Sequence, residues 1–187
     1  MNLIKNFLKA NNSSDEEISH FFSKLVQVDF KKSDIILKSG QTENYLSFVE
    51  RGLLRFYVKK EDKEITFDFA FAGNFTSGYS SFLTRDPSLF FIQAIADTSL
   101  WRIGYEDLQD VYKESEKAQM IGRLAAEQLF IRKTKRELSF LTQSAEERYR
   151  HLLHEQPEMI QEIPLKYLAS YIGITPEALS RIRKRKN

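Results

Sequence analysis

The chain contains no cysteine. This excludes disulfides, thiolate nucleophiles, cysteine-ligated zinc and cysteine-held iron–sulfur clusters. No apolar run approaches the ~20 residues that a membrane-spanning helix needs. The N-terminal segment Met1–Lys9 also lacks the long apolar core and small-residue cleavage site of a signal peptide. We therefore expect a cytoplasmic protein with no membrane partner.

Histidine is scarce, with three in the chain. His151 and His154 lie three residues apart on an expected helix, but the sequence offers no clear third ligand for a zinc site. We predict no metal and no cofactor. The sequence also lacks a Ser/His/Asp arrangement, a P-loop, a dinucleotide-binding fingerprint and a paired-carboxylate site. The prediction is that the chain is not an enzyme.

No large charge excess is present, and the net charge is +2. Basic and acidic residues balance over residues 1–143, whereas residues 144–187 carry eight basic and six acidic residues. Five of those basic residues fall within six positions near the C-terminus: Arg181, Arg183, Lys184, Arg185 and Lys186. Such a cluster indicates binding to a phosphate backbone. The alternative is a solvated helix end whose cations suit the helix dipole.

What the sequence does contain is a run of short strand-like segments between two helical regions. Helices are expected over residues 3–10 and 15–27. Strands are then expected over 28–32, 34–38, 45–50, 53–58, 64–71, 89–96 and 99–103, where β-branched and aromatic residues alternate with polar ones. Turn signals separate them at intervals of 8–12 residues, which predicts an antiparallel sandwich or barrel.

Helical patterns return from Tyr105 onward. Residues 116–142 form a long helical stretch in which Leu124, Ile131 and Leu138 fall seven apart. The second rank of this heptad is weaker, since Gln128 follows Ile121. The pattern predicts a homodimer through these five residues; the alternative is a single helix packed on its own β domain. A further helix is expected over 144–155, with Ser144 and Glu147 as a capping box.

The most informative stretch is Leu165–Ile182. Apolar residues at helical spacing lead up to Gly173, which can end a helix in the left-handed conformation. Thr175 can then cap a second helix that has Pro176 at its first position. Leu179 and Ile182 face inward, and the polar side chains face out. This is the pattern of a helix-turn-helix whose second helix enters the DNA major groove.

The order of these elements resembles the cyclic-AMP receptor/fumarate-nitrate regulator family of bacterial transcription factors. In the β region the resemblance lies in three glycine turns: Leu37–Gly40, Phe48–Gly52 and Phe71–Phe75. In the C-terminal region it lies in Leu168-Ala-x-x-x-Gly173-Ile-Thr-x-Glu-x-Leu-Ser-Arg181. The second motif is the more specific of the two.

The resemblance implies an α+β fold with three parts. Residues 1–115 would form an antiparallel β-roll sensor resembling the jelly roll of cyclic-nucleotide-binding domains. Residues 116–142 would form the dimerisation helix, and residues 143–187 the helix-turn-helix domain. That family continues into a β-hairpin wing, most or all of which we expect this sequence to lack. The implied function is a homodimeric transcriptional regulator that binds double-stranded DNA, RNA polymerase and a small-molecule effector of unknown identity.

The family motif also assigns DNA-reading residues. Glu177 and Arg181 match the last two members of an Arg-Glu-x-x-x-Arg core, and Pro176 replaces the first arginine. Arg181 can donate two hydrogen bonds to guanine, and Glu177 can accept one from cytosine. Contacts to phosphates are expected from Thr175, Ser180, Arg183 and Lys184. The alternative for Glu177 is a first-turn carboxylate that complements the helix dipole.

The sensor departs from the family at its ligand site. Cyclic-nucleotide-binding members hold the ribose with a glutamate and the cyclic phosphate with an arginine. At the matching positions this chain has Ser77-Gly78-Tyr79 and Phe90-Phe91-Ile92, and Arg85 lies five residues too early. We therefore expect no cyclic-AMP binding of the usual kind. The candidate for a more apolar effector site comprises Phe75, Ser77, Gly78, Tyr79, Ser80, Ser81, Phe90 and Phe91. The alternative for Phe90 and Phe91 is ordinary β-roll core.

One alternative function remains at this level. The chain can also be a ligand-binding module whose helical C-terminal part contacts a protein partner rather than DNA. The loss of DNA binding with rising salt distinguishes the two functions, because a protein that neutralises several phosphates releases counterions.

Overall fold

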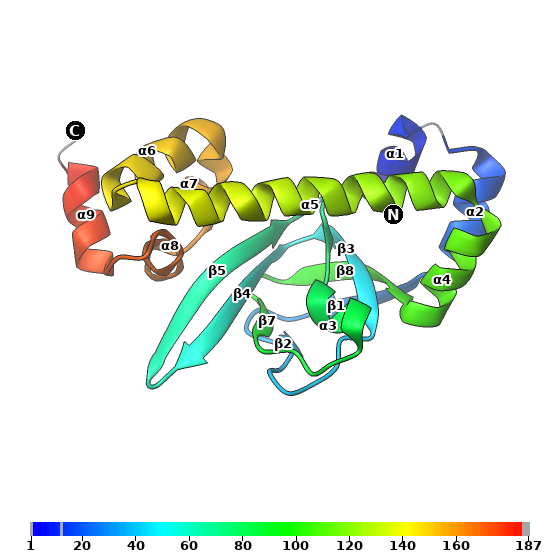
Figure 1. Ribbon diagram of the computed structural model, residues 1–187, viewed down its shortest axis with the longest axis horizontal. Helices are drawn as coiled ribbons and strands as arrows, with labels where there is room; N and C mark the ends of the chain where they lie inside the picture. Colours follow the sequence, from blue (N-terminus) through cyan, green and yellow to red (C-terminus); the bar gives the residue numbers. More distant parts are fainter. Residues whose placement is uncertain (1, 12, 185–187) are drawn as a thin grey trace. The chain divides into compact units, whose positions relative to one another are not determined.

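The computed structural model describes residues 2–11 and 13–184 (Figure 1). Arg185 and Lys186 of the predicted basic cluster lie outside the described residues. Tertiary contacts divide the chain into two compact units. The first unit comprises residues up to Val58 together with Asp68–Ala126, and the second comprises Lys59–Phe67 together with the chain from Glu127 onward. The predicted boundaries at residues 115 and 142 stay predictions.

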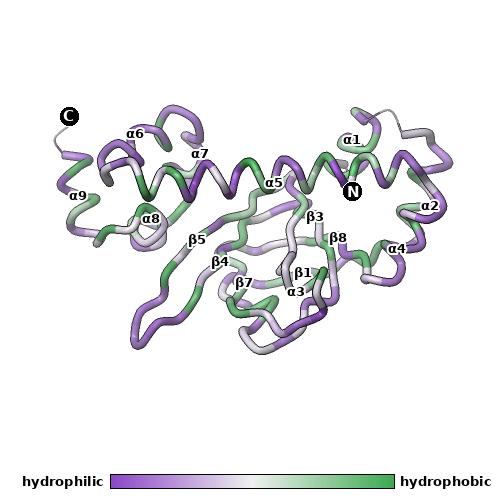
Figure 2. Tube along the Cα trace, viewed as in Figure 1, coloured by the Kyte–Doolittle hydropathy of each residue, from purple (hydrophilic) through white to green (hydrophobic). Residues whose placement is uncertain are grey.

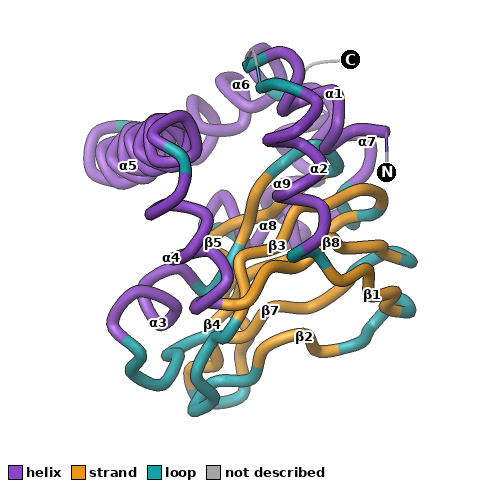
Figure 3. The backbone as a smooth tube through the Cα atoms, turned by 90° about the vertical axis from the view of Figure 1, so that its right-hand side faces the viewer, coloured by secondary structure: helices purple, strands orange, loops and turns teal. Residues whose placement is uncertain are grey.

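Two four-stranded sheets form the β region. One sheet has the strand order β1-β8-β3-β6 and the other β2-β7-β4-β5. Pairing is antiparallel in β1–β8, β3–β8, β3–β6, β2–β7 and β4–β7, as the alternating sequence predicts. Figure 3 draws these strands in orange. Their bounds are β1 Val26–Phe30, β2 Ile35–Leu37, β3 Tyr45–Arg51, β4 Leu53–Lys60, β5 Lys63–Phe71, β6 Phe75–Thr76, β7 Phe91–Ala94 and β8 Thr98–Gly104.

Gly52 permits the turn between β3 and β4. Its φ is 100°, and a Cβ atom there would collide with the side chain and backbone of Thr98. The Leu53 N–H donates to the Thr98 hydroxyl at 3.3 Å, so β4 begins directly against β8. Only glycine combines this left-handed backbone with so close an approach.

Two N-terminal helices cover one face of the first sheet: α1, Asn2–Ala10, and α2, Asp15–Ser23. Ile4, Ile18 and Phe48 are buried together, with Trp101 packed against them. The predicted helix over 15–27 is four residues too long, since β1 begins at Val26. Lys24 caps α2, and the β-branched Val26 and Val28 then pair with β8.

A short helix, α3 (Tyr79–Thr84), follows β6 and was not predicted. Its Phe82 is buried with Ile103 of β8 and with Leu108 and Val111 of α4 (Tyr105–Glu114). The predicted strand over 89–96 is shorter and spans Phe91–Ala94. Tertiary packing of Phe82, rather than local helix periodicity, accounts for α3.

The helical region contains α5, Glu116–Thr142, a continuous helix of 27 residues. It has no buried residue, and Figure 2 shows hydrophobic and hydrophilic segments alternating along it. Then follow α6 Ala145–Glu155, α7 Pro157–Glu162, α8 Leu165–Ile172 and α9 Pro176–Lys184. The capping box of α6 forms as predicted, because Ser144 and Glu147 each accept the other's backbone N–H. The unpredicted α7 buries Met159.

Among the described residues, no helix combines the length and the hydrophobicity that a membrane span requires.

Candidate nucleic-acid interface and effector region

The predicted helix-turn-helix is present in α8 and α9. Gly173 ends α8 with φ 85°, and the Ile174 N–H donates to the Ala169 carbonyl at 3.0 Å. This bond closes a Schellman-type turn, which satisfies a carbonyl that the helix end would otherwise leave open. Leu168, Ile172 and Leu179 are at most 1% exposed. The two helices therefore hold each other through one apolar seam.

Thr175 caps the start of α9. Its hydroxyl accepts the Ala178 N–H at 3.3 Å, and its carbonyl accepts the Leu179 N–H at 3.0 Å. The pKa of Glu177 is lowered, first by a hydrogen bond to its own backbone N–H, then by one to the Thr175 side chain and by the nearby Arg181. Thr175 thus has a structural role in addition to the phosphate contact that we predict for it.

The predicted DNA-reading residues fall into two groups. Thr175, Glu177, Arg181 and Lys184 are exposed, whereas Ser180 and Arg183 are half-buried. The Arg183 guanidinium lies 5.9 Å from the ring of Tyr149 on α6, and its Nε atom is buried without a hydrogen-bond partner. Arg183 therefore packs toward α6, and the exposed charges of α9 are Glu177, Arg181 and Lys184.

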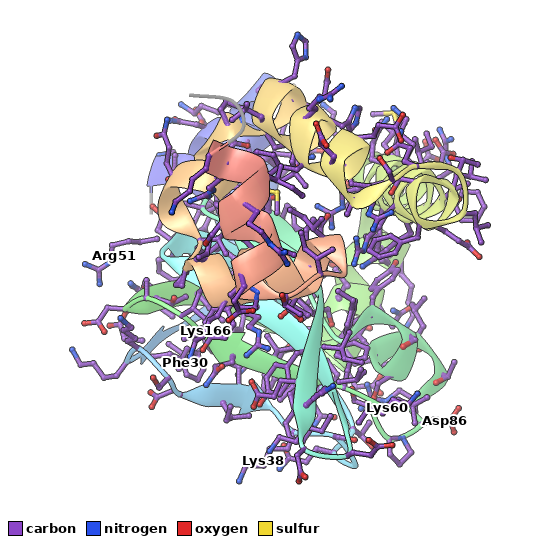
Figure 4. The ribbon with its side chains drawn as sticks, turned by 90° about the vertical axis from the view of Figure 1, so that its left-hand side faces the viewer. Phe30, Lys38, Arg51, Lys60, Asp86 and Lys166 are labelled. Carbon is purple, nitrogen blue, oxygen red and sulfur yellow. The ribbon has the colours of Figure 1, made fainter. Side chains whose placement is uncertain are left out.

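Lys166 is a residue that sequence reasoning missed. It is exposed in the first turn of α8, and its Nζ atom lies 4.6 Å from the ring centre of Tyr167 (Figure 4). A cation at the start of a helix opposes the helix dipole. This unfavourable placement is the local signal in the sequence by which Lys166 could have been noticed.

The five predicted dimer residues span about 100° around α5, the width of a heptad seam. Leu124, Ile131 and Leu138 are 41%, 44% and 53% exposed, whereas Ile121 is half-buried. Gln128 is exposed, and Gln128 and Ile121 lie about 40° and 60° around the helix from Leu124. Three further apolar side chains of α5 are exposed and adjoin Leu124, Ile131 and Leu138. Met120 lies in line with Leu138, whereas Leu141 and Phe130 lie about 60° and 80° from Leu138, on the side away from Gln128. We call these six exposed apolar residues the α5 stripe.

In the β region, Glu43 joins the start of α3 to β8. One carboxylate oxygen accepts the Gly78 N–H at 3.3 Å. The other accepts the Tyr45 N–H at 3.0 Å and lies 3.5 Å from Nη2 of Arg102. Both side chains are largely buried, 4% and 12% exposed. Burial raises the pKa of Glu43 and lowers that of Arg102, in both cases against the attraction between them.

The end of α3 is fixed to the same loop. Arg85 donates from Nη1 to the Glu43 carbonyl at 2.8 Å and from Nη2 to the Asn44 side chain at 2.5 Å. Its guanidinium also lies 4.8 Å from the ring centre of Tyr105. The Glu43 N–H donates to the Ser81 hydroxyl at 3.0 Å. Arg85 is thus held by protein groups in the structure.

The predicted effector residues are not gathered at one place. Phe75 packs edge-on against Phe48 and Phe7 in the core beneath α1, so it belongs to that core. Gly78 and Ser81 are buried at α3, Ser77 and Ser80 are more exposed there, and Tyr79 stacks on Phe82.

Phe90 and Phe91 form a separate group with β4. Phe91 stacks on Tyr57 with ring centres 5.0 Å apart, and Phe90 lies 6.1 Å from Phe56. This packing agrees with the alternative that the two phenylalanines are β-roll core.

Comparison with known proteins finds a similar domain for the β region. Residues 27–115 match the family model of the cyclic nucleotide-binding domain. This segment is therefore similar to that domain. A search of curated proteins finds no match.

Solved structures extend the likeness to the whole chain. A CooA variant from Carboxydothermus hydrogenoformans shares 18% identity with a TM-score of 0.75, covering 95% of this chain and 82% of that one. The c-di-GMP responsive regulator CLP of Xanthomonas campestris shares 18% identity with a TM-score of 0.72, covering 92% and 91%. A putative Crp/Fnr-family regulator of Eubacterium rectale shares 22% identity with a TM-score of 0.71, covering 94% and 84%. The chain has the fold of the Crp/Fnr-family regulators.

Proposed function

We propose that this chain is a homodimeric DNA-binding regulator of transcription that uses α9 as its recognition helix. The observation that carries this proposal is that α9 is amphipathic, with one apolar buried face and one charged exposed face. Leu179 is 0% exposed against α8, whereas Glu177, Arg181 and Lys184 are exposed. The similarity to solved regulators supports the same function.

Each exposed residue of α9 has a distinct role in this proposal. Arg181 donates two hydrogen bonds to a guanine in the major groove, and Glu177 accepts one from a cytosine amino group. Lys184 contacts a phosphate, which adds affinity but no base preference. Glu177 and Arg181 are four residues apart and so lie on one face of the helix.

The α5 stripe is the proposed dimer interface. Phe130 and Leu141 are 72% and 76% exposed, and a second copy of the stripe would cover them. In a two-fold dimer the same stripe meets itself. Two recognition helices would then read half-sites about one DNA turn apart, ~34 Å.

The sensor is proposed to respond to something other than cyclic AMP. The Gly78 N–H at the start of α3 already donates to the Glu43 carboxylate, and Arg85 is bound to the loop of Glu43 and Asn44. A cyclic phosphate would therefore have to displace a carboxylate and would meet Phe90 and Phe91 where the domain family has its arginine. An unpaired anion there is costly to desolvate.

The test compares two substitutions on α9 in the full-length protein. The probe is a duplex selected from random-sequence DNA by the wild-type chain. Arg181→Gln is expected to weaken binding about tenfold and to relax the preference at one base pair in each half-site. Lys184→Gln is expected to weaken binding to all duplexes alike.

Arg150→Gln is the matched control. It removes the same charge from an exposed position on α6, where Arg150 pairs with Glu146. If all three variants bind like the wild type, α9 does not read DNA. A wild-type protein that selects and binds no duplex would instead support the second candidate function, a ligand-binding module with a protein partner.

A further inference from the structure

The last turn of α8 is held by two arginines from other helices. Arg136 of α5 donates from Nη2 to the Tyr171 carbonyl at 3.1 Å. Arg148 of α6 donates from Nε to the Ile172 carbonyl at 3.0 Å. These carbonyls are among the last four of α8, which have no partner within their own helix.

Phe140 contacts both arginines. Its ring centre is 4.5 Å from the Arg136 guanidinium and 4.4 Å from that of Arg148. Arg148 also donates from Nη1 to the Gln143 carbonyl at 2.5 Å, where α5 gives way to α6. The two cations, which repel each other, thus share an aromatic ring that attracts both.

The turn of the helix-turn-helix rests on the same ring. A Cβ atom on Gly173 would lie 2.9 Å from Cε1 of Phe140. The end of α5, the start of α6 and the turn before α9 therefore meet in one cluster, which we call the arginine clamp: Arg136, Phe140, Arg148, Tyr171, Ile172 and Gly173.

We propose that Arg136 and Arg148 are positioning residues for DNA recognition. By joining the end of α5 to the turn between α8 and α9, they fix the direction of the recognition helix relative to the dimer helix. This inference rests on the proposed function. The arginine clamp should affect half-site spacing as well as protein stability. The reason is that the distance between two recognition helices depends on how rigidly each helix is held to α5.

Rigid attachment predicts a strict half-site spacing. A dimer with both clamps intact accepts one spacing, because half-sites are read about one turn apart. A dimer with loosened clamps tolerates inserted base pairs and binds the preferred spacing less tightly. Ordering each recognition helix then lowers the free energy gained on binding DNA.

The experiment uses Arg148→Gln in the full-length protein, with Arg150→Gln as the control of equal charge on the same helix. The probes are the selected duplex and versions with one or two base pairs inserted between the half-sites. Hydrogen exchange of residues 165–184 is measured in the absence of DNA. Arg148→Lys is a second variant, which keeps the charge but lacks the planar fork that reaches both carbonyls.

For Arg148→Gln we expect about tenfold weaker binding at the preferred spacing, the size of one lost charge-assisted hydrogen bond. The penalty for inserted base pairs should shrink, and exchange over residues 165–184 should accelerate while the β strands stay protected. Arg148→Lys should show the same changes to a smaller extent, and it replaces Arg148→Gln if that variant does not fold. The control should match the wild type.

Two results would overturn the inference. One is a spacing profile for Arg148→Gln that equals that of Arg150→Gln, and the other is unchanged exchange over residues 165–184. Failure of the proposed function looks different. In that case the wild-type protein itself binds no duplex, while the exchange measurement still reports whether the clamp holds α8.

Discussion

The Ser170 hydroxyl of α8 bridges two backbone groups of β5. It accepts the Thr66 N–H at 2.9 Å and donates to the Glu64 carbonyl at 3.2 Å. Strand β5 lies at the edge of its sheet, where backbone N–H and C=O groups have no neighbouring strand on one side. One side chain of the helix-turn-helix thus does for this part of β5 what a neighbouring strand would do.

Replacing Ser170 should measurably destabilise the protein. Ser170→Ala removes the acceptor that the Thr66 N–H uses, and Thr66 is 0% exposed. We expect the free energy of unfolding to fall by about 1–2 kcal/mol, measured by urea denaturation. Ser180→Ala on α9 is the control, and a loss of equal size there would contradict this account.

The turn of the helix-turn-helix should tolerate glycine alone. Gly173→Ala puts alanine at a left-handed backbone position that alanine resists. It also places a Cβ atom 2.9 Å from Cε1 of Phe140. We expect a loss of about 1–2 kcal/mol in the free energy of unfolding. Adding Phe140→Leu should relieve the contact but not the backbone cost. A double variant as stable as Phe140→Leu alone would show that the backbone conformation is unimportant.

The buried ion pair of Glu43 and Arg102 should cost more stability when one partner is replaced than when both are replaced. Arg102→Leu leaves Glu43 buried without its cation, and we expect a loss of about 3 kcal/mol. The double variant Arg102→Leu/Glu43→Gln should lose less than Arg102→Leu, because no buried charge then remains. Thermal and urea unfolding of the three proteins provide the comparison. A double variant less stable than Arg102→Leu would contradict the prediction.

The same pair predicts a pH dependence. Because burial raises the pKa of Glu43 in the folded state, its contribution to stability is largest below the ordinary pKa of a glutamate in the unfolded chain. The contribution is lost as the pH rises through the higher folded pKa. The difference in unfolding free energy between wild type and Glu43→Gln should therefore shift against the wild type as the pH rises from 4 toward 7. A pH-independent difference would argue against this assignment.

Cyclic AMP should not bind the sensor at micromolar concentration. The expected result in isothermal titration calorimetry is no heat of binding, since Glu43 and Arg85 already use the groups around α3. Micromolar binding would overturn this part of the account. Phe91→Arg is the informative companion variant, because it places a cation near the position where the domain family has one.

The helix-turn-helix could be predicted from sequence because its signals are local. Gly173, Thr175 and Pro176 each act on the backbone of their own turn, and the structure confirms the two helices that they imply. The capping box of Ser144 and Glu147 is local in the same sense.

The features of the β region that sequence reasoning missed depend on residues distant in the chain. Glu43 has its cationic partner 59 residues away at Arg102, and no spacing in the sequence joins them. Helix α3 forms around the burial of Phe82 against β8 and α4 rather than through an amphipathic repeat. Likewise, nothing in the sequence around Arg148 distinguishes it from a surface arginine, because its contact with α8 is to the Ile172 carbonyl, 24 residues away.

The central claim, that a dimer of this chain binds DNA through α9, is tested most directly by one salt titration. The affinity of the full-length protein for a labelled duplex is measured from low to moderate salt. We predict a steep linear fall of log affinity with log salt, about 0.9 for each phosphate neutralised, and a slope shallower by roughly two for a dimer carrying Lys184→Gln in both copies. Absence of DNA binding even at the lowest salt would contradict the account.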